Sequence, residues 1–280
     1  MAKYRLDVVL VENGLVKSRS LAQRMIMAGQ VRVNGQVQFK PSAKIDDRST
    51  IDIDPGPRYV SRGGEKLAAA VEAFSPKIKN RVCADVGAST GGFTDCLLQN
   101  SAVRVYAIDV GHGILDWRLR NDSRVVVLEN TNARYLESLP EPVDLVTIDV
   151  SFISLKLILP VVTQWFGSPQ TSIQSSRPEE NSRENGVRGQ VIALIKPQFE
   201  AGRKEVQRGK GVIKDPEIHR QVLVDVLTFA EEGGFGFQGL IRSPIKGPKG
   251  NTEFLAYFGF QKPSSLDTEH ILNDVFGEQL

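Results

Sequence analysis

The spacing of apolar residues differs between the first 60 residues and the rest of the chain. Apolar positions recur at helical spacing over residues 6–10 and 15–26, and Ser18-Arg19-Ser20 is typical of a helix start within the second range. Apolar and polar residues then alternate over residues 31–37, around an Asn-Gly turn, and again over residues 50–54. This pattern predicts two short helices followed by a small sheet.

Beyond residue 64 the pattern changes to short buried strands separated by helices. Residues 55–64 are punctuated by Pro and Gly, and residues 65–74 place apolar side chains on one helical face. Apolar runs typical of buried parallel strands follow at residues 82–86, 103–109, 125–128, 145–150 and 191–195. We therefore expect a doubly wound α/β domain at residues 65–262, a linker at 57–64 and a small α+β domain at 1–56.

Two further segments depart from this alternation. The stretch 167–190 is rich in Ser, Pro, Asn, Glu and Arg and nearly free of apolar residues, which is typical of a disordered insertion without chemistry of its own. In the tail, residues 263–280, the residues Ile271, Leu272, Val275 and Phe276 predict a short amphipathic helix. We expect this helix to be a packing element.

Composition and charge narrow the class of protein. The 280 residues are 41% hydrophobic and 24% charged, as in ordinary globular proteins, and lack an apolar stretch of about 18 residues or a signal-peptide pattern. We therefore expect a cytoplasmic protein without stable membrane insertion. Residues 1–60 contain ten Lys or Arg and six Asp or Glu, so the net charge of +2 hides a basic N-terminus. The two cysteines and three histidines show no ligand spacing, and no metal site is expected.

Residues 81–98 run an apolar strand into a glycine-rich turn and then into a helix that starts near Phe93. The turn reads D-x-G-x-S-x-G-G from Asp85, whereas a dinucleotide site reads G-x-G-x-x-G. The next strand ends in Asp109, about 20 residues beyond, where a carboxylate can accept hydrogen bonds from ribose hydroxyls. We expect nucleoside binding, with the glycines removing Cβ atoms that would block the ligand.

This arrangement resembles the S-adenosylmethionine site of class I, Rossmann-like methyltransferases, whose cofactor carries an ammonium and a sulfonium but no phosphate. The resemblance implies that fold and that cofactor. The expected cofactor-binding residues are Asp85, Gly87, Ala88, Ser89, Thr90, Gly91, Gly92, Phe93 and Asp109, with Asn132 on the adenine side. A dehydrogenase and a plain glycine-rich surface turn are the alternatives at this point.

Charged residues close two of the predicted buried strands. Asp149 ends one and Lys196 ends another, so both are expected in the crevice with the cofactor. Lys66 precedes the glycine-rich turn and Glu253 starts a further apolar run, which gives the order Lys, Asp, Lys, Glu. This order resembles the tetrad of FtsJ-like RNA ribose 2′-O-methyltransferases. The segments SRGGEKL, TIDVSFISL, LIKPQFE and NTEFL around the four residues resemble the TlyA family of hemolysin-like rRNA 2′-O-methyltransferases.

The tetrad suits the reaction that this resemblance implies. A ribose hydroxyl is a poor nucleophile and must lose its proton as the methyl group is transferred. A lysine can act as the base where burial or a neighbouring cation lowers its pKa. We expect Lys196, with Lys66 nearby, to deprotonate or steer the hydroxyl, while Asp149 and Glu253 orient the lysines and Asp149 also lies near the methionine ammonium.

The basic N-terminus resembles an S4 RNA-binding module over RLDVVLVENGLVKSRSLAQRMIMAGQVRVNG. This resemblance implies docking on structured RNA, and the candidate phosphate contacts are Arg5, Lys17, Arg19 and Arg24. Further candidates for an RNA path near the crevice are Arg62, Arg118, Arg120, Lys246 and Lys249. The alternative interpretation of each of these basic residues is an ordinary solvent-exposed charge without a role in RNA binding.

Taken together, these resemblances imply S-adenosylmethionine-dependent 2′-O-methylation of ribose, of cytidine in ribosomal RNA, with ribosomal RNA or subunits as partners. Two alternatives remain open. One is a cytolysin, whose lytic effect would be indirect because the chain has neither a spanning segment nor an export signal. The other is a non-catalytic RNA-binding ribosome-assembly factor. The sequence leaves open the target nucleotide and the oligomeric state.

Overall fold

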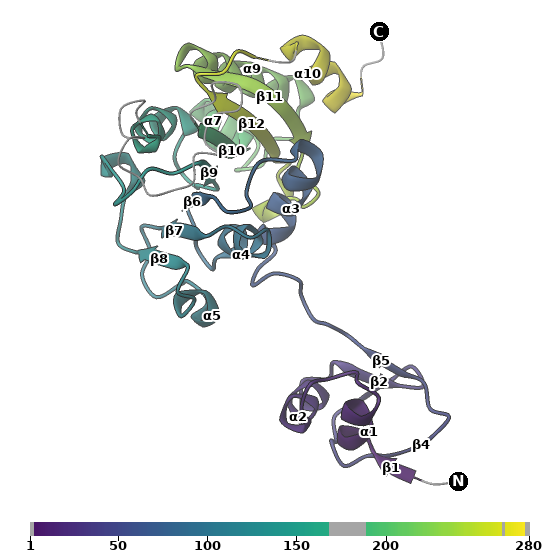
Figure 1. The fold of residues 1–280 in the computed structure, drawn as a ribbon. Helices are drawn as coiled ribbons and strands as arrows, with labels where there is room; N and C mark the ends of the chain where they lie inside the picture. The colour runs from purple at the N-terminus through teal and green to yellow at the C-terminus, as the bar shows by residue number, and fades with distance from the viewer. Residues whose placement is uncertain (1–2, 168–188, 265–266, 278–280) are drawn as a thin grey trace. The chain divides into compact units, whose positions relative to one another are not determined.

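The computed structural model describes residues 3–167, 189–264 and 267–277. These residues form two compact units that divide between Arg58 and Tyr59 (Figure 1). The insertion expected at residues 167–190 falls almost wholly in 168–188, outside the described residues. Each unit has its own apolar core, so each is described by itself.

The smaller unit combines two helices with short strands. Its elements are β1 (Lys3–Arg5), α1 (Leu6–Glu12), α2 (Arg19–Met27), β2 (Val31–Val33), β3 (Gln36–Gln38), β4 (Lys44–Asp46) and β5 (Ile51–Ile53). The Ser18 hydroxyl accepts a hydrogen bond from the Leu21 amide, which caps α2 as predicted. Asn34 and Gly35 both have positive φ between β2 and β3, as an Asn-Gly hairpin turn requires. The pairing of β1 with β4 was not predicted.

The larger unit contains a seven-stranded sheet. Its strands are β6 (Val82–Val86), β7 (Arg104–Ile108), β8 (Val125–Leu128), β9 (Leu145–Ile148), β10 (Gly189–Ile195), β11 (Phe235–Arg242) and β12 (Phe254–Phe260). They lie in the order β11-β12-β10-β9-β6-β7-β8. The five strands from β10 to β8 are parallel, whereas β12 is antiparallel to both β10 and β11. The predicted α/β fold is confirmed, and the antiparallel strand is an addition to it.

Helices cover both faces of this sheet (Figure 1). They include α3 (Gly63–Phe74), α4 (Gly92–Gln99), α5 (Trp117–Arg120), α6 (Leu159–Val162), α7 (Pro197–Glu200), α8 (Arg203–Arg208), α9 (Pro216–Glu232) and α10 (Thr268–Phe276), with short 3-10 turns η1 (Ala133–Tyr135), η2 (Leu155–Leu157), η3 (Thr163–Trp165) and η7 (Pro248–Gly250). Alternate side chains of β10 enter different cores: Ile192 and Leu194 pack with α3 and α4, while Val191 and Ile195 pack with α6 and α9. This two-sided burial explains the unbroken apolar runs.

Segments at both ends of the larger unit pack into it. Tyr59 is 2% exposed and lies so close to Gly64 that a Cβ there would be 2.2 Å from the tyrosine Cγ. Residues 59–64, expected as part of a linker, are therefore part of this unit, and α3 begins at Gly63. At the other end, Leu272 of α10 is fully buried against the core that contains α9. The tail thus packs on the unit through the apolar face expected from its sequence.

Candidate active site

A cavity of about 310 Å³ lies at the carboxyl ends of β6, β9 and β10. All four residues of the expected tetrad line it: Lys66 from α3, Asp149 after β9, Lys196 after β10 and Glu253 just before β12. The cavity is also lined by Ala88, Thr90, Gly92 and Phe93 of the glycine-rich turn and by Arg62 and Lys246. Residues from distant parts of the sequence therefore meet where open α/β sheets bind ligands.

The four tetrad residues form two ion pairs in this cavity. Lys66 Nζ lies 2.6 Å from Glu253 Oε2, and the Glu253 side chain is fully buried. Lys196 Nζ lies 2.6 Å from Asp149 Oδ1 and donates a hydrogen bond to Ser151 Oγ at 2.9 Å. Each lysine thus has its own carboxylate, which compensates the cost of placing charges in a largely buried site.

Glu253 has two further neighbours that sequence reasoning did not identify. Gln198 donates a hydrogen bond at 3.4 Å to Glu253 Oε1, the oxygen that does not contact Lys66. A Cβ at Gly247 would lie 2.0 Å from the same oxygen. A side chain at position 247 would therefore displace the Glu253 carboxylate from its pair with Lys66.

A second cavity, of about 410 Å³, adjoins the first. The two share Gly87, Ser89, Asp149 and Ser151 as lining residues. Asp109 and Asn132, expected on the nucleoside side, line the second cavity together with apolar residues that include Val110, Ala133 and Ile158. Most of the expected cofactor residues therefore line one or both of two adjoining cavities, whereas Asp85 and Gly91 line neither.

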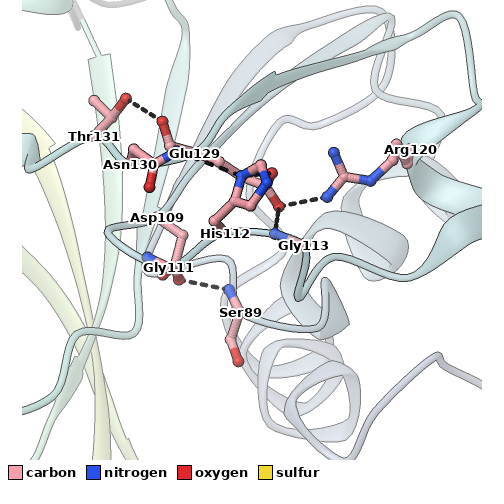
Figure 2. A network of polar contacts seen from close by, with 9 residues as sticks. All are labelled: Ser89, Asp109, Gly111, His112, Gly113, Arg120, Glu129, Asn130 and Thr131. Carbon is pink, nitrogen blue, oxygen red and sulfur yellow. Dashed lines mark hydrogen bonds and ion pairs between the residues drawn. The ribbon is translucent and has the colours of Figure 1, made fainter.

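Asp109 belongs to a network of polar contacts between the loops after β7 and β8 (Figure 2). Its two carboxylate oxygens accept hydrogen bonds from the amides of Ser89 at 2.8 Å and Gly111 at 2.7 Å. Glu129 accepts a hydrogen bond from the Gly113 amide at 2.9 Å and pairs with Arg120. These contacts hold the loop that follows Asp109 from both of its ends.

Charge stabilises the ionised form of Glu129 in this network. The hydrogen bond from Arg120 is the main cause that lowers the pKa of Glu129 to about 2, and the Gly113 amide and His112 act in the same direction. His112 Nδ1 lies 3.2 Å from Glu129 Oε2. Glu129 is therefore an anionic anchor at neutral pH, a role that the sequence did not indicate.

Asp85 is not exposed to either cavity. It lies within β6, is fully buried, and accepts hydrogen bonds from the hydroxyls of Thr94 at 2.7 Å and Thr147 at 3.2 Å. Burial raises its pKa to about 7, and the negative charge of Asp149 adds to this shift. The expectation that Asp85 lies in the crevice is thus wrong for this structure, because its side chain points into the sheet–helix interior.

The glycines of the turn also act differently from the expectation. A Cβ at Gly87 would lie 2.4 Å from the Asp149 carbonyl oxygen, and one at Gly92 would lie 2.4 Å from Ser61 Oγ. A Cβ at Gly91, which has φ +95°, would meet the Leu119 side chain at 2.2 Å. These glycines allow close packing of the turn on neighbouring segments of the protein, instead of clearing space for a ligand.

Comparison with known proteins identifies the larger unit. A family model described as FtsJ-like methyltransferase matches residues 59–260, which is more than half of the chain. The chain belongs to the FtsJ-like methyltransferase family. An S4 domain model matches residues 5–51, so the smaller unit is an S4 domain.

Relatives of this FtsJ-like protein match both units together. YqxC of Bacillus subtilis is 44% identical over 98% of this chain and 93% of its own length. TlyA of Mycobacterium tuberculosis, named a 16S/23S rRNA (cytidine-2′-O)-methyltransferase, is 40% identical over 95% of this chain and 93% of its own. The solved structure of a hemolysin candidate from Streptococcus thermophilus has a TM-score of 0.68 at 40% identity and covers 99% of this chain and 97% of its own.

One aromatic side chain that lines a cavity of the FtsJ-like unit was not predicted from the sequence. Phe152 lines the second cavity, is 90% exposed and has φ +64°. Positive φ is strained for a bulky residue, and such strain clusters at functional sites. The Phe152 ring rests on Phe199, with centroids 4.9 Å apart. Phe152 is notable because its large apolar side chain is exposed, and the degree of exposure of a side chain cannot be read from the sequence.

In the S4 domain, a buried carboxylate organises two of the expected RNA contacts. Asp7 is fully buried and accepts hydrogen bonds from Arg5, Arg19 and Gln23 at 2.9–3.0 Å. These donors hold its pKa well below the usual range, with the Arg5 contact as the largest cause. Lys17 and Arg24 are exposed. Of the basic residues expected along an RNA path near the crevice, Arg62 and Lys246 line the tetrad cavity.

No group of three or more His, Cys, Asp or Glu among residues 3–167, 189–264 and 267–277 is placed to hold a metal ion. Across the same part of the chain, no helix is long and apolar enough to cross a membrane.

Proposed function

We propose that this FtsJ-like protein is an S-adenosylmethionine-dependent ribose 2′-O-methyltransferase that acts on cytidine in ribosomal RNA. The observation that carries the proposal is the pair of ion pairs, Lys66–Glu253 and Lys196–Asp149, in one cavity that shares a wall with a nucleoside-sized cavity. A buried cluster of this kind, at a cleft, is typical of catalytic sites.

The chemistry of the second cavity fits S-adenosylmethionine better than a dinucleotide. Its lining, among the residues that the structure describes, includes the carboxylates of Asp109 and Asp149 and no lysine or arginine. A pyrophosphate would be repelled there, whereas a cationic sulfonium and ammonium would be attracted. The Asp109 oxygens each accept one backbone amide and keep lone pairs for ribose hydroxyls. Asp109 and Asn132 would thus hold the adenosine, and Asp149 would lie near the methionine part.

The first cavity supplies the groups that a ribose hydroxyl needs. S-adenosylmethionine would supply an electrophilic methyl group for the hydroxyl oxygen, and the methyl–sulfur bond would break to leave a neutral thioether. Lys196, held by Asp149 and Ser151, would orient the hydroxyl and, in its neutral amine form, take up the proton that the hydroxyl loses. Lys66 and Glu253 also line this cavity, and their ion pair would contribute to its charge and shape.

Features around the first cavity suit a polyanionic substrate with bases. Arg62 and Lys246 line it and provide positive charge for phosphates. The exposed ring of Phe152 lies at the adjoining cavity, where an aromatic face can stack on a base. The S4 domain adds the basic N-terminal surface. The name of TlyA of Mycobacterium tuberculosis gives cytidine in ribosomal RNA as its substrate. If this protein acts on the same substrate, it would work in the cytoplasm.

The proposal is tested by mapping 2′-O-methylated nucleotides in ribosomal RNA from cells with and without this protein. We expect at least one methylated cytidine to disappear in its absence and to return when the purified protein and S-adenosylmethionine are added to unmethylated ribosomal subunits. An unchanged inventory of 2′-O-methylated nucleotides, together with RNA binding but no methyl transfer, would instead favour a non-catalytic assembly factor.

A further inference from the structure

The short helix α7 connects the tetrad to the loop after β9. Lys196, directly before α7, contacts Asp149 and Ser151 at the start of that loop. The contacts further along α7 follow the loop in the same order: Phe199 packs on Phe152, and Glu200 binds Ser154 and Leu155. Residues 196–200 therefore hold residues 149–155 at three successive points.

Glu200 makes the last of these three contacts with both carboxylate oxygens. Its Oε2 accepts a hydrogen bond from the Ser154 hydroxyl at 2.5 Å, and its Oε1 accepts one from the Leu155 amide at 2.8 Å. The Ser154 hydroxyl in turn accepts from the Lys156 amide at 3.2 Å, so the carboxylate caps η2 through backbone and side chain together. Burial raises the pKa of Glu200, which marks it as a partly desolvated group.

The loop between these contacts needs such an anchor. Phe152 has φ +64° and is 90% exposed, so neither backbone preference nor burial of its ring favours the observed conformation. The same loop carries Asp149 and Ser151, the two groups that hold Lys196. An unanchored loop would relax toward ordinary φ values and change the position of these groups relative to Lys196.

We propose that Glu200 is a positioning residue that holds the loop 149–155 in the conformation needed for methyl transfer to RNA. The inference rests on the proposed function and extends it to a residue outside both cavities. Glu200 lines neither cavity, and it acts through Ser154 and Leu155 on the geometry between Asp149, Ser151 and Lys196.

The experiment compares three full-length variants with the wild type in methyl transfer to unmethylated ribosomal subunits. Glu200→Ala removes both hydrogen bonds and should lower kcat by roughly 10- to 100-fold, the cost of a small misplacement of reacting groups. Glu200→Gln keeps an acceptor for the Leu155 amide and a polar partner for Ser154, and should recover most of kcat. Glu231→Ala removes a similar Glu–Ser hydrogen bond, to Ser264 at 2.6 Å, away from both cavities, and should leave kcat unchanged.

Two further measurements separate positioning from folding. The affinity for S-adenosylmethionine, measured by calorimetry, should fall by a smaller factor than kcat in Glu200→Ala, because residues 149–153 line part of the second cavity while Asp109 and its hydrogen-bond partners lie outside the loop 149–155. Amide exchange at residues 150–158 should increase in that variant, while the remainder of the unit keeps wild-type exchange.

The outcomes distinguish this inference from the function on which it rests. Wild-type kcat in Glu200→Ala would overturn the positioning role and leave the proposed function intact. A loss of kcat that Glu200→Gln does not restore, with faster exchange throughout the FtsJ-like unit, would show a general structural role and also overturn it. Absence of methyl transfer by the wild type would contradict the proposed function itself.

Discussion

Lys196 Nζ lies within 2.9 Å of both Asp149 and Ser151, and it lines only the first of the two cavities. Lys196→Ala should therefore lower methyl transfer by roughly 10²- to 10⁴-fold, the usual contribution of a positioned base. Affinity for S-adenosylmethionine should remain nearly intact, because the lining of the second cavity is preserved. Single-turnover transfer and calorimetry measure the two quantities, with Lys214→Ala, at an exposed position, as the control. Full activity of Lys196→Ala would contradict the assigned role.

Asp85 provides a test in pH dependence. Because burial raises its pKa from 3.8 to about 7, the protonated form stabilises the folded protein, and this contribution is lost as pH rises from about 4 through 7. Asp85→Asn removes the ionisation and keeps an acceptor for a threonine hydroxyl. Relative to wild type, the variant should gain up to a few kcal/mol of unfolding free energy between pH 4 and pH 8. Urea unfolding across this range measures it, and a pH-independent difference would contradict the shift.

Among individual residues, the sequence predicted the four residues of the tetrad but not the polar residues that contact them or their loop. Lys66, Asp149, Lys196 and Glu253 could be found because charged residues at the ends of apolar runs are conspicuous and their order matches a known tetrad. Ser151, Gln198 and Glu200 are ordinary polar residues whose importance depends on contacts at 2.5–3.4 Å across the fold. Asp85 was misplaced because its carboxylate faces inward from the middle of β6.

Among the elements, the loop after β7 is held in part by Glu129, which accepts a hydrogen bond from the Gly113 amide. Glu129→Gln removes the ion pair with Arg120 and the carboxylate contact with His112, while a carbonyl remains for the Gly113 amide. The loop should hold Asp109 less firmly, so KM for S-adenosylmethionine should rise by roughly 3- to 10-fold, with kcat at saturating cofactor near wild type.

The matched control for this element is Glu141→Gln. Glu141 pairs with Arg104 at the opposite end of β7, 2.6 Å apart, and lines neither cavity. The Glu141→Gln variant should have the same KM for S-adenosylmethionine as the wild type. An equal rise in KM for both variants would show that loss of any ion pair on this strand weakens cofactor binding, and would remove the specific role of Glu129.

The predicted elements agree best with the structure where packing is two-sided. The runs that became β6, β9 and β10 are buried on both faces, which is why they read as continuous apolar segments. Strand β11 was not predicted, because Gly236, Gln238 and Gly239 interrupt its apolar residues. The antiparallel direction of β12 could not be predicted from the sequence either, because the direction of a strand depends on where the preceding segment crosses the sheet.

For the whole molecule, the basic N-terminus should appear as a salt-dependent affinity for RNA. Lys17 and Arg24 are exposed, whereas Arg5 and Arg19 are hydrogen-bonded to Asp7. The double variant Lys17→Ala/Arg24→Ala should bind ribosomal RNA more weakly and reduce the slope of log K against log salt by about 1 to 2. Its affinity for S-adenosylmethionine should equal that of wild type.

Fluorescence anisotropy at several salt concentrations measures this slope. Lys79→Ala/Lys214→Ala removes the same charge from exposed positions of the FtsJ-like unit that line neither cavity, and should reduce the slope less. Equal slopes for the two double variants would indicate that net charge, and not the S4 surface, governs RNA affinity.

The wall shared by the two cavities has a consequence for inhibition. Gly87, Ser89, Asp149 and Ser151 line both cavities, so the proposed sites of the methyl donor and the acceptor adjoin one another. A single compound that joins an adenosine-like group to a second nucleoside by a short bridge would occupy both, and the second half would bind at the high effective concentration set by the first. Such a bisubstrate ligand would compete with donor and acceptor at once.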